Sequence, residues 1–321
     1  MKIMIIDSVG SGRIPYKTTK DIIEHYELTG HEVRKSSSYG PDLVRWADVV
    51  LFEWCDNNVV VFSNDKEITD EELKGKKIIN RVVDIDAYAG HYNGVNWSRI
   101  TNLLFMSKHI QSMVNANMMK NEVYASIPQQ VIPLGINMDK WTFKDRSDIN
   151  TRGYTIGFFT HMWEAKGFPE ALEIINKLIR TTGKPWVLKC VGTWSGGAGW
   201  WAKKYFDHFV QDTGLEKSIT HEEYVEDINA FYQECDYFLH CSLKDSFSLV
   251  CGEAMACGLK TPIHSFWGAR EIWPEKYIWN YMDDAVRMIT EPSYDSNEYR
   301  KAIEDLYSID KINAMWDSLI L

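Results

Sequence analysis

Segments typical of buried strands alternate with segments of helical periodicity along the whole chain. Runs rich in β-branched and other apolar residues, as in strands covered on both faces, occupy 2–7, 47–54, 76–85, 102–107, 154–159, 186–192, 236–242 and 260–266. Helix-like segments lie between them, at 18–28, 169–183, 222–235 and 249–258. Neighbouring parallel strands need a crossover, which is usually a helix. The alternation therefore predicts an α/β fold with parallel, doubly wound sheets.

A polar stretch, FKDRSDINTRG at 143–153, interrupts this alternation and is the candidate linker between two αβα domains. The expected domains are residues 1–142 and 143–298, followed by an amphipathic helical segment at 299–321. Parallel sheets bind ligands beyond the carboxyl ends of their strands. We therefore expect the strand-to-helix loops of the two domains to line a cleft between them.

Charge, cysteines and hydropathy exclude several classes of function. The net charge of −10 disfavours a nucleic-acid partner, since such proteins usually carry a basic excess. The 6 cysteines form neither CxxC pairs nor the cysteine–histidine spacing of zinc sites. We therefore expect no metal site, buried unbridged thiols and a cytoplasmic location. No apolar run reaches the roughly 18 residues of a membrane-spanning helix, so any membrane contact would be peripheral.

The stretch KDSFSLVCGEAMACG (244–258) holds two acids, Asp245 and Glu253, on either side of an apolar segment. It leaves a predicted strand and enters a predicted helix, so Asp245 falls in the loop. Ser248, Leu249 and Val250 fall at the helix N-terminus, where backbone N–H groups and the helix dipole favour an anion. The order of a carboxylate, an anion-binding helix N-terminus and a second carboxylate matches the order of sugar, diphosphate and ribose in a nucleotide diphosphate sugar.

A second stretch, HMWEAKGFPEALEII (161–175), fits the same ligand. Lys166 lies in the loop just before a predicted helix and can supply the positive charge that a diphosphate needs. His161 lies a few residues earlier and can assist when it is protonated.

These stretches resemble the motifs of a known family. SLKDSFSLVCGEAMACG (242–258) looks like the nucleotide-sugar signature of retaining glycosyltransferases of family four, the glycosyl transferases group 1. THMWEAKGFPEALEII (160–175) resembles the basic loop of that family, and IPLGINMDKWTF (132–143) resembles its interdomain segment. The resemblance covers most of the chain in the right order. It implies a GT-B fold, with two facing Rossmann-like domains and a last helix that packs back toward the first domain.

The resemblance also implies roles for individual residues. Asp245 would contact hydroxyls of the donor sugar, and Glu253 those of the ribose. Lys166 and the amides of 248–250 would hold the diphosphate, so that no metal or other cofactor is needed. Asp245, Lys166 and His161 are the predicted catalytic residues.

Three further positions complete the predicted donor site. Phe247 is the aromatic residue of the signature. The glycines at 10–12 let the first loop approach the donor closely, which brings in Gly12. Thr193 lies near the start of a loop rich in glycine and tryptophan, GTWSGGAGWW (192–201), that can pack on the base or on an acceptor sugar.

The acceptor side is expected in the first domain. RVVDIDAYAGHYNGVNW (81–97) leaves a predicted strand and enters a polar, aromatic loop. The candidates there are Asp84, Asp86, Tyr88 and His91.

The predicted function is a retaining transfer of sugar from a nucleotide diphosphate sugar, with a UDP-sugar as the first guess. The acceptor would be a hydroxyl, with a glycan or lipid-linked glycan as the first class. Two positions depart from the family pattern, Asp245 where glutamate is usual and His161 where arginine is usual. They leave open a non-catalytic nucleotide-sugar-binding protein or a hydrolase, epimerase or phosphorylase of the same fold. Glycosylation of modified phage DNA is a minor alternative that the acidic charge disfavours.

Overall fold

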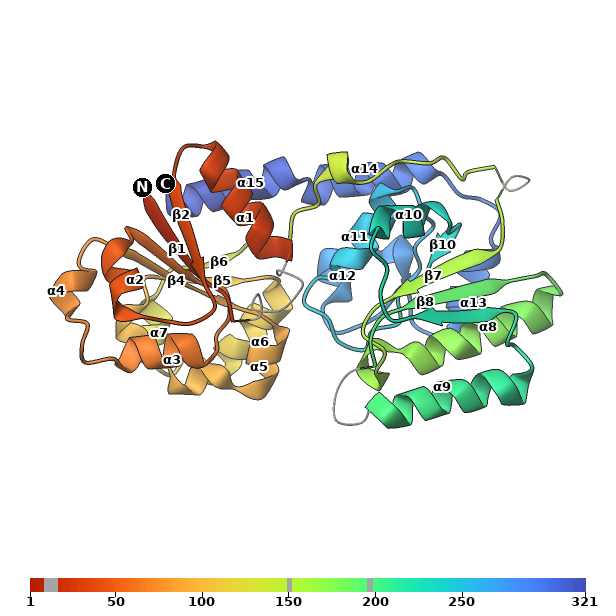
Figure 1. The fold of residues 1–321 in the computed structure, drawn as a ribbon, viewed down its shortest axis with the longest axis horizontal. Helices are drawn as coiled ribbons and strands as arrows, with labels where there is room; N and C mark the ends of the chain where they lie inside the picture. Colours follow the sequence, from red (N-terminus) through yellow and green to blue (C-terminus); the bar gives the residue numbers. More distant parts are fainter. Residues whose placement is uncertain (9–16, 149–151, 195–198) are drawn as a thin grey trace. The chain divides into compact units, whose positions relative to one another are not determined.

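The computed structural model describes residues 1–8, 17–148, 152–194 and 199–321 and divides the chain into two compact units. Unit 1 combines Met1–Gly135 with Asp310–Leu321, and unit 2 comprises Ile136–Ile309. Both units contain parallel sheets with helices packed on them (Figure 1). The boundary at Gly135 falls a few residues before the predicted boundary at 142. Within the described residues, no helix combines the length and apolar character needed to cross a membrane.

Unit 1 is built on a six-stranded parallel sheet with the order β2-β1-β3-β4-β5-β6. The strands are β1 (Lys2–Ile6), β2 (Glu32–Ser36), β3 (Val49–Phe52), β4 (Lys77–Val82), β5 (Asn102–Phe105) and β6 (Gln129–Val131). The helices are α1 (Lys17–Leu28), α2 (Pro41–Trp46), α3 (Asn57–Asn64), α4 (Asp70–Leu73), α5 (Asp84–Ala89), α6 (Lys108–Met118) and α7 (Glu122–Ser126), with the short turns η2 (His91–Gly94) and η3 (Trp97–Arg99).

Both faces of this sheet are buried, because its central strands β1, β3 and β4 place apolar side chains on both sides. In β1, Ile3 and Ile5 point into one core and Met4 and Ile6 into the other. The first core is shared with α1 and with α15 (Ile309–Ile320), whose Trp316 is buried there. Residues Asp310–Leu321, which include most of α15, thus form part of unit 1.

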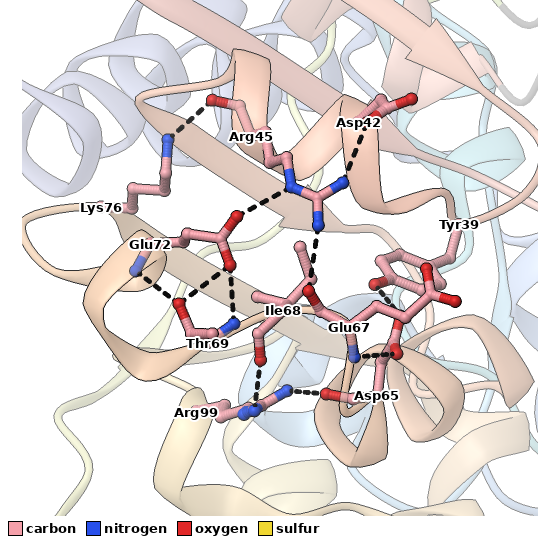
Figure 2. A network of polar contacts seen from close by, with 10 residues as sticks. All are labelled: Tyr39, Asp42, Arg45, Asp65, Glu67, Ile68, Thr69, Glu72, Lys76 and Arg99. Carbon is pink, nitrogen blue, oxygen red and sulfur yellow. Dashed lines mark hydrogen bonds and ion pairs between the residues drawn. The ribbon is translucent and has the colours of Figure 1, made fainter.

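A network of polar contacts fixes the connection between α3 and α4 in unit 1 (Figure 2). Arg99 donates hydrogen bonds to the carbonyl oxygens of Asp65 and Ile68, at 2.6 and 2.7 Å. Arg45 contacts Glu72 at 2.8 Å, and Glu72 forms a capping box with Thr69 at the start of α4. Hydrogen bonds from the Thr69 backbone and from Arg45 lower the pKa of Glu72 to about 2, so this carboxylate stays ionised at neutral pH.

Unit 2 is built on a four-stranded parallel sheet with the order β10-β7-β8-β9, beside a two-stranded sheet, β11-β12. The strands are β7 (Thr155–Phe159), β8 (Val187–Val191), β9 (Ile219–Glu222), β10 (Tyr237–Phe238), β11 (Ile263–His264) and β12 (Ile278–Trp279). The helices are α8 (Phe168–Thr182), α9 (Gly199–Thr213), α10 (Ile228–Gln233), α11 (Leu249–Ala256), α12 (Ala269–Ile272), α13 (Met282–Thr290) and α14 (Ser296–Tyr307), with the turns η4 (Met138–Lys140), η5 (Glu164–Lys166) and η6 (Glu275–Tyr277). A parallel bridge between His240 and Ile263 joins the two sheets.

The structure confirms the predicted α/β class and most of the strand positions. It differs at 222–235, predicted as one helix, where β9 ends at Glu222 and α10 begins only at Ile228. The C-terminal segment 299–321 is two helices rather than one. They separate at Ser308, whose extended backbone ends α14, and the bridge between Ser308 and Ile136 holds this break.

The polar stretch 143–153 lies within unit 2, and one of its arginines is buried there. Arg146 is 2% exposed. It donates hydrogen bonds to the carbonyl oxygens of Tyr232, Cys235 and Cys257, at 2.8–3.0 Å. These carbonyls follow or end α10 and α11, where the last groups have no partner within the helix. This part of the stretch therefore secures two helix ends instead of forming an exposed linker.

Candidate functional site

Lys166, Asp245 and Ser248, three of the predicted site residues, lie together where β7 and β10 end in unit 2. The carboxyl ends of parallel strands lie at one edge of a sheet, which is where such sheets bind ligands. A pocket at this edge is lined by residues from both strands and from the following loops, including Lys166, His240, Asp245, Ser248 and Val250. Lys166 and Asp245 are far apart in sequence and close in space.

The loop that carries Asp245 is held by an unusual backbone conformation. Ser248 has φ 67° and ψ 71°, and it is the only non-glycine residue with positive φ among the described parts of the chain. This left-handed conformation costs a serine about 1–2 kcal/mol, which the surrounding contacts must offset. The amide of Ser248 donates to Asp245 Oδ1 at 3.1 Å. Strained backbone of this kind clusters at functional sites.

The same conformation leads directly into α11, which begins at Leu249. The Ser248 hydroxyl turns toward Cys251 Sγ, at 3.3 Å, and the first helical hydrogen bond joins Cys251 N to the Ser248 carbonyl. The amides of Leu249 and Val250 belong to the first turn, where N–H groups have no partner within the helix. Both residues are only half-buried, so this end of the helix is suited to an anion.

Asp245 lies between a cation and an imidazole. Its Oδ2 is 3.1 Å from Lys166 Nζ and 3.6 Å from His240 Nε2. Burial by itself would raise the pKa of Asp245, but the Lys166 ammonium and the His240 ring outweigh it and hold this pKa well below its usual range. Burial lowers the pKa of His240, although the Asp245 carboxylate opposes that shift. At neutral pH the site therefore contains an ionised Asp245 and a neutral His240.

A glycine brings Lys166 to this position. Gly167 follows η5 with φ 73°, and a Cβ atom on it would lie 2.1 Å from the carbonyl oxygen of Cys241. Only glycine allows the two loops to approach so closely. A hydrogen bond from Leu243 N to the Ala165 carbonyl, at 2.9 Å, joins the same loops.

Glu253 is enclosed in unit 2. Its side chain is 2% exposed, and Tyr232 donates a hydrogen bond to Oε2 at 3.2 Å. Tyr232 is itself buried, and burial followed by the charge of Glu253 raises its pKa well above the usual value. The contact of Glu253 with ribose stays a prediction.

His161 and Thr193 lie together at the ends of β7 and β8. His161 Nδ1 is 3.4 Å from Thr193 Oγ1, and the amide of Met162 donates to the Thr193 carbonyl at 2.9 Å. Partial desolvation of the ring, then the nearby charge of Lys166, lower the pKa of His161. The histidine is therefore largely neutral at neutral pH in the ligand-free site.

Phe247 and Gly12 are two further predicted donor residues. Phe247 is 1% exposed, and its ring packs against Trp273 and Tyr307. Its side chain therefore belongs to the core, and a contact of this residue with the donor stays a prediction. Gly12 lies outside the described residues, and so does the middle of the glycine and tryptophan loop, 195–198.

The acceptor candidates lie on α5 and η2 of unit 1. Asp86 is buried, and its Oδ2 accepts from the amides of Cys55 and Val83 at 2.9 and 3.2 Å, so it joins the ends of β3 and β4. Burial raises the pKa of Asp86. Asp84 is half-buried, whereas Tyr88 and His91 are exposed. Asp86 thus has a structural task, and contacts of the four residues with an acceptor stay predictions.

Sequence reasoning did not find His240, which the structure places beside Asp245. It stands at the end of the apolar run DYFLHCS, where a polar residue within a predicted strand was the only signal.

Three comparisons place these features among known proteins. The family model described as "Glycosyl transferases group 1" matches residues 139–318. No curated protein matches the chain. Among solved structures, Anabaena Alr3699/HepE in complex with UDP aligns with a TM-score of 0.77 and 13% identity, covering 100% of this chain and 99% of that one. The same protein in complex with UDP-glucose aligns with a TM-score of 0.71, 14% identity and the same coverage.

A further solved structure is sucrose-phosphate synthase (tll1590) from Thermosynechococcus elongatus. It aligns with a TM-score of 0.73 and 12% identity, covering 99% of this chain and 98% of that one. At such identities the likeness shows the fold, and the predicted GT-B class is confirmed.

Proposed function

Because the chain belongs to the glycosyl transferases group 1 family, we propose that it transfers a sugar from a nucleotide diphosphate sugar to a hydroxyl acceptor. One observation carries this proposal: Lys166, the N-terminus of α11 and Asp245 meet at one pocket of unit 2. A cation and backbone amides suit a diphosphate, and a carboxylate beside them suits sugar hydroxyls. The HepE complexes with UDP and UDP-glucose support a UDP-sugar as the first donor to test.

In the proposed reaction the anomeric configuration is retained by attack of the acceptor hydroxyl on the face that the diphosphate leaves. The departing diphosphate takes the acceptor proton, while Lys166 and the amides of Leu249 and Val250 stabilise its charge. Asp245 orients the donor sugar and Glu253 holds the ribose. These groups replace a metal ion, so we propose that the protein needs no cofactor. A glycan or lipid-linked glycan is the proposed acceptor class, and the cytoplasm the proposed location.

One observation favours a second candidate, a nucleotide-sugar-binding protein without turnover. Both carboxylate oxygens of Asp245 already have partners, Ser248 N and Lys166 Nζ, and the aspartate is shorter than the usual glutamate. A carboxylate held in this way would contact a sugar less closely. Binding of a nucleotide sugar without release of its nucleotide, also in the presence of glycan and lipid-linked acceptors, would identify this case.

The first test is a thermal-shift panel with UDP, GDP, ADP and dTDP and their glucose conjugates. A ligand at 100 times its dissociation constant stabilises the folded state by about 2.7 kcal/mol, which raises the midpoint by roughly 4 °C for a protein of this size. We expect UDP and UDP-glucose to give the largest shifts. If none of the eight compounds shifts the midpoint, the proposed donor site is wrong.

Because His161 can titrate near neutral pH, we expect donor binding to depend on pH. A diphosphate favours protonated His161, whose pKa is lowered in the empty site. UDP-glucose affinity should therefore fall by up to about 10-fold as pH rises from about 5.5 to 7.5. UDP-glucose is the probe because, unlike UDP, its diphosphate has no proton to lose in this range.

Calorimetric titration at several pH values checks this prediction. His161→Arg should bind more tightly at pH 7.5 and show a flat profile, because its charge does not titrate. A His161→Arg variant that keeps the wild-type slope would show that another group takes up the proton.

A further inference from the structure

His240 is buried in the wall of the donor pocket. Its side chain is 4% exposed, and the residue lines the pocket together with Lys166, Asp245 and Ser248. Neither ring nitrogen forms a hydrogen bond within the described part of the chain. A buried imidazole without a partner lowers stability, so an unpaired ring beside a ligand pocket suggests a contact that forms when the pocket is occupied.

The backbone of His240 is fixed from several sides. Its amide donates to the Pro262 carbonyl at 3.1 Å, and its carbonyl accepts from His264 N at 3.0 Å and from Trp279 Nε1 at 3.2 Å. The ring meets Phe266 edge to face, with centroids 5.5 Å apart. A side chain held in this way can position a neighbour with little loss of conformational entropy.

The neighbour that His240 can position is Asp245, whose two carboxylate oxygens are held differently. Ser248 N holds Oδ1 at 3.1 Å, so this oxygen is fixed by the backbone. Oδ2 depends on Lys166 Nζ at 3.1 Å, while His240 Nε2 stands just beyond hydrogen-bond range at 3.6 Å. A bound diphosphate would compete with Asp245 for Lys166, and Oδ2 would then lose its cation at the moment when the donor sugar arrives.

We propose that His240 is a positioning residue that holds Asp245 Oδ2 through Nε2–H when the donor diphosphate engages Lys166. The inference rests on the proposed function and adds a residue to that site. A small movement closes the gap between the two atoms. The carboxylate then stays ionised and correctly turned toward the sugar, although its cation now serves the phosphates.

The ring is surrounded by Asp245, by Lys166 from η5 and by His264 of β11, all of which influence its titration. With His240 in place, the pKa of Asp245 stays low in the donor complex. Without the Nε2–H donor this pKa should rise, because a carboxylate loses a group that favours its charged form. The pH profile of turnover therefore reports the contact, and a merely structural role of His240 would not move it.

The experiment compares His240→Leu with His240→Gln, whose amide nitrogen can reach the place of Nε2. The probes are UDP, for calorimetric binding, and UDP-glucose, for release of UDP. We expect His240→Leu to reduce turnover by about 10- to 50-fold while UDP affinity stays within about 2-fold. The acidic limb of its turnover profile should move to higher pH. His240→Gln should recover turnover to within about 3-fold of wild type and return the acidic limb of the pH profile to its wild-type position.

Melting curves of both variants separate loss of folding from loss of the contact. The inference is wrong if folded His240→Leu turns over like wild type, if its UDP affinity falls as far as its turnover, or if glutamine is no better than leucine. If the wild type neither binds UDP nor releases it from UDP-glucose, the proposed function fails, and the inference fails with it.

Discussion

Substitution of Lys166 by alanine is expected to weaken UDP binding by about 100-fold, because a buried phosphate loses a charge-assisted hydrogen bond worth roughly 1.5–3 kcal/mol. Lys166 is only 20% exposed and stands in the pocket next to the start of α11. Few water molecules can therefore replace its ammonium. Isothermal titration of UDP into the wild type and the variant measures the effect.

The matched control is Lys177→Ala. Lys177 also belongs to unit 2 and also pairs with an aspartate, Asp283, but it lies on the outer part of α8 and is 44% exposed. Its removal should leave UDP affinity within about 2-fold of wild type, as expected for a surface ion pair. Equal UDP binding by Lys166→Ala and Lys177→Ala would remove Lys166 from the phosphate site.

Substitution of Asp245 by asparagine is expected to reduce release of UDP from UDP-glucose by about 100-fold and to change UDP affinity by less than about 3-fold. Asparagine has nearly the same shape and can still accept the hydrogen bond from Ser248 N through its carbonyl oxygen. It lacks the charge that orients sugar hydroxyls. Steady-state turnover and UDP titration, measured on the same preparation, separate the two effects.

Asp283→Asn provides the control for this second substitution, since it removes a carboxylate that pairs with a lysine elsewhere in unit 2. It should leave both turnover and UDP affinity unchanged. If Asp245→Asn keeps wild-type turnover, the carboxylate has no role at the sugar, and the inference about His240 loses its basis as well.

Most of the fold could be predicted because its strands are continuous apolar runs, as in β1 and β3, which are buried on both faces. Elements without such a run were missed. β9, with the sequence ITHE, has only one fully buried residue, Ile219, and α9 starts beside a loop rich in glycine and tryptophan that gives no helix signal. The break at Ser308 depends on a bridge to Ile136, a contact distant in sequence.

In the candidate site, too, local sequence patterns predicted some features, whereas tertiary contacts determine the others. Motif spacing was sufficient to select Lys166 and Asp245, and the structure brings them to 3.1 Å. The left-handed backbone of Ser248 and the proximity of His240 arise from tertiary contacts, which no local pattern reports. The motif likewise gave no indication that the Phe247 side chain packs in the core against Trp273.

The core of unit 1 is completed by a helix that the ribosome makes after the whole of unit 2. Ile312, Trp316 and Leu319 of α15 cover β1 and its neighbours, and Lys77 donates hydrogen bonds to the carbonyls of Leu319 and Ile320 at the end of that helix. During translation, part of one apolar face of the six-stranded sheet therefore stays uncovered while unit 2, more than half of the chain, is synthesised. Exposed apolar surface of this kind is prone to aggregation, so we expect the nascent chain to bind chaperones until α15 has been made.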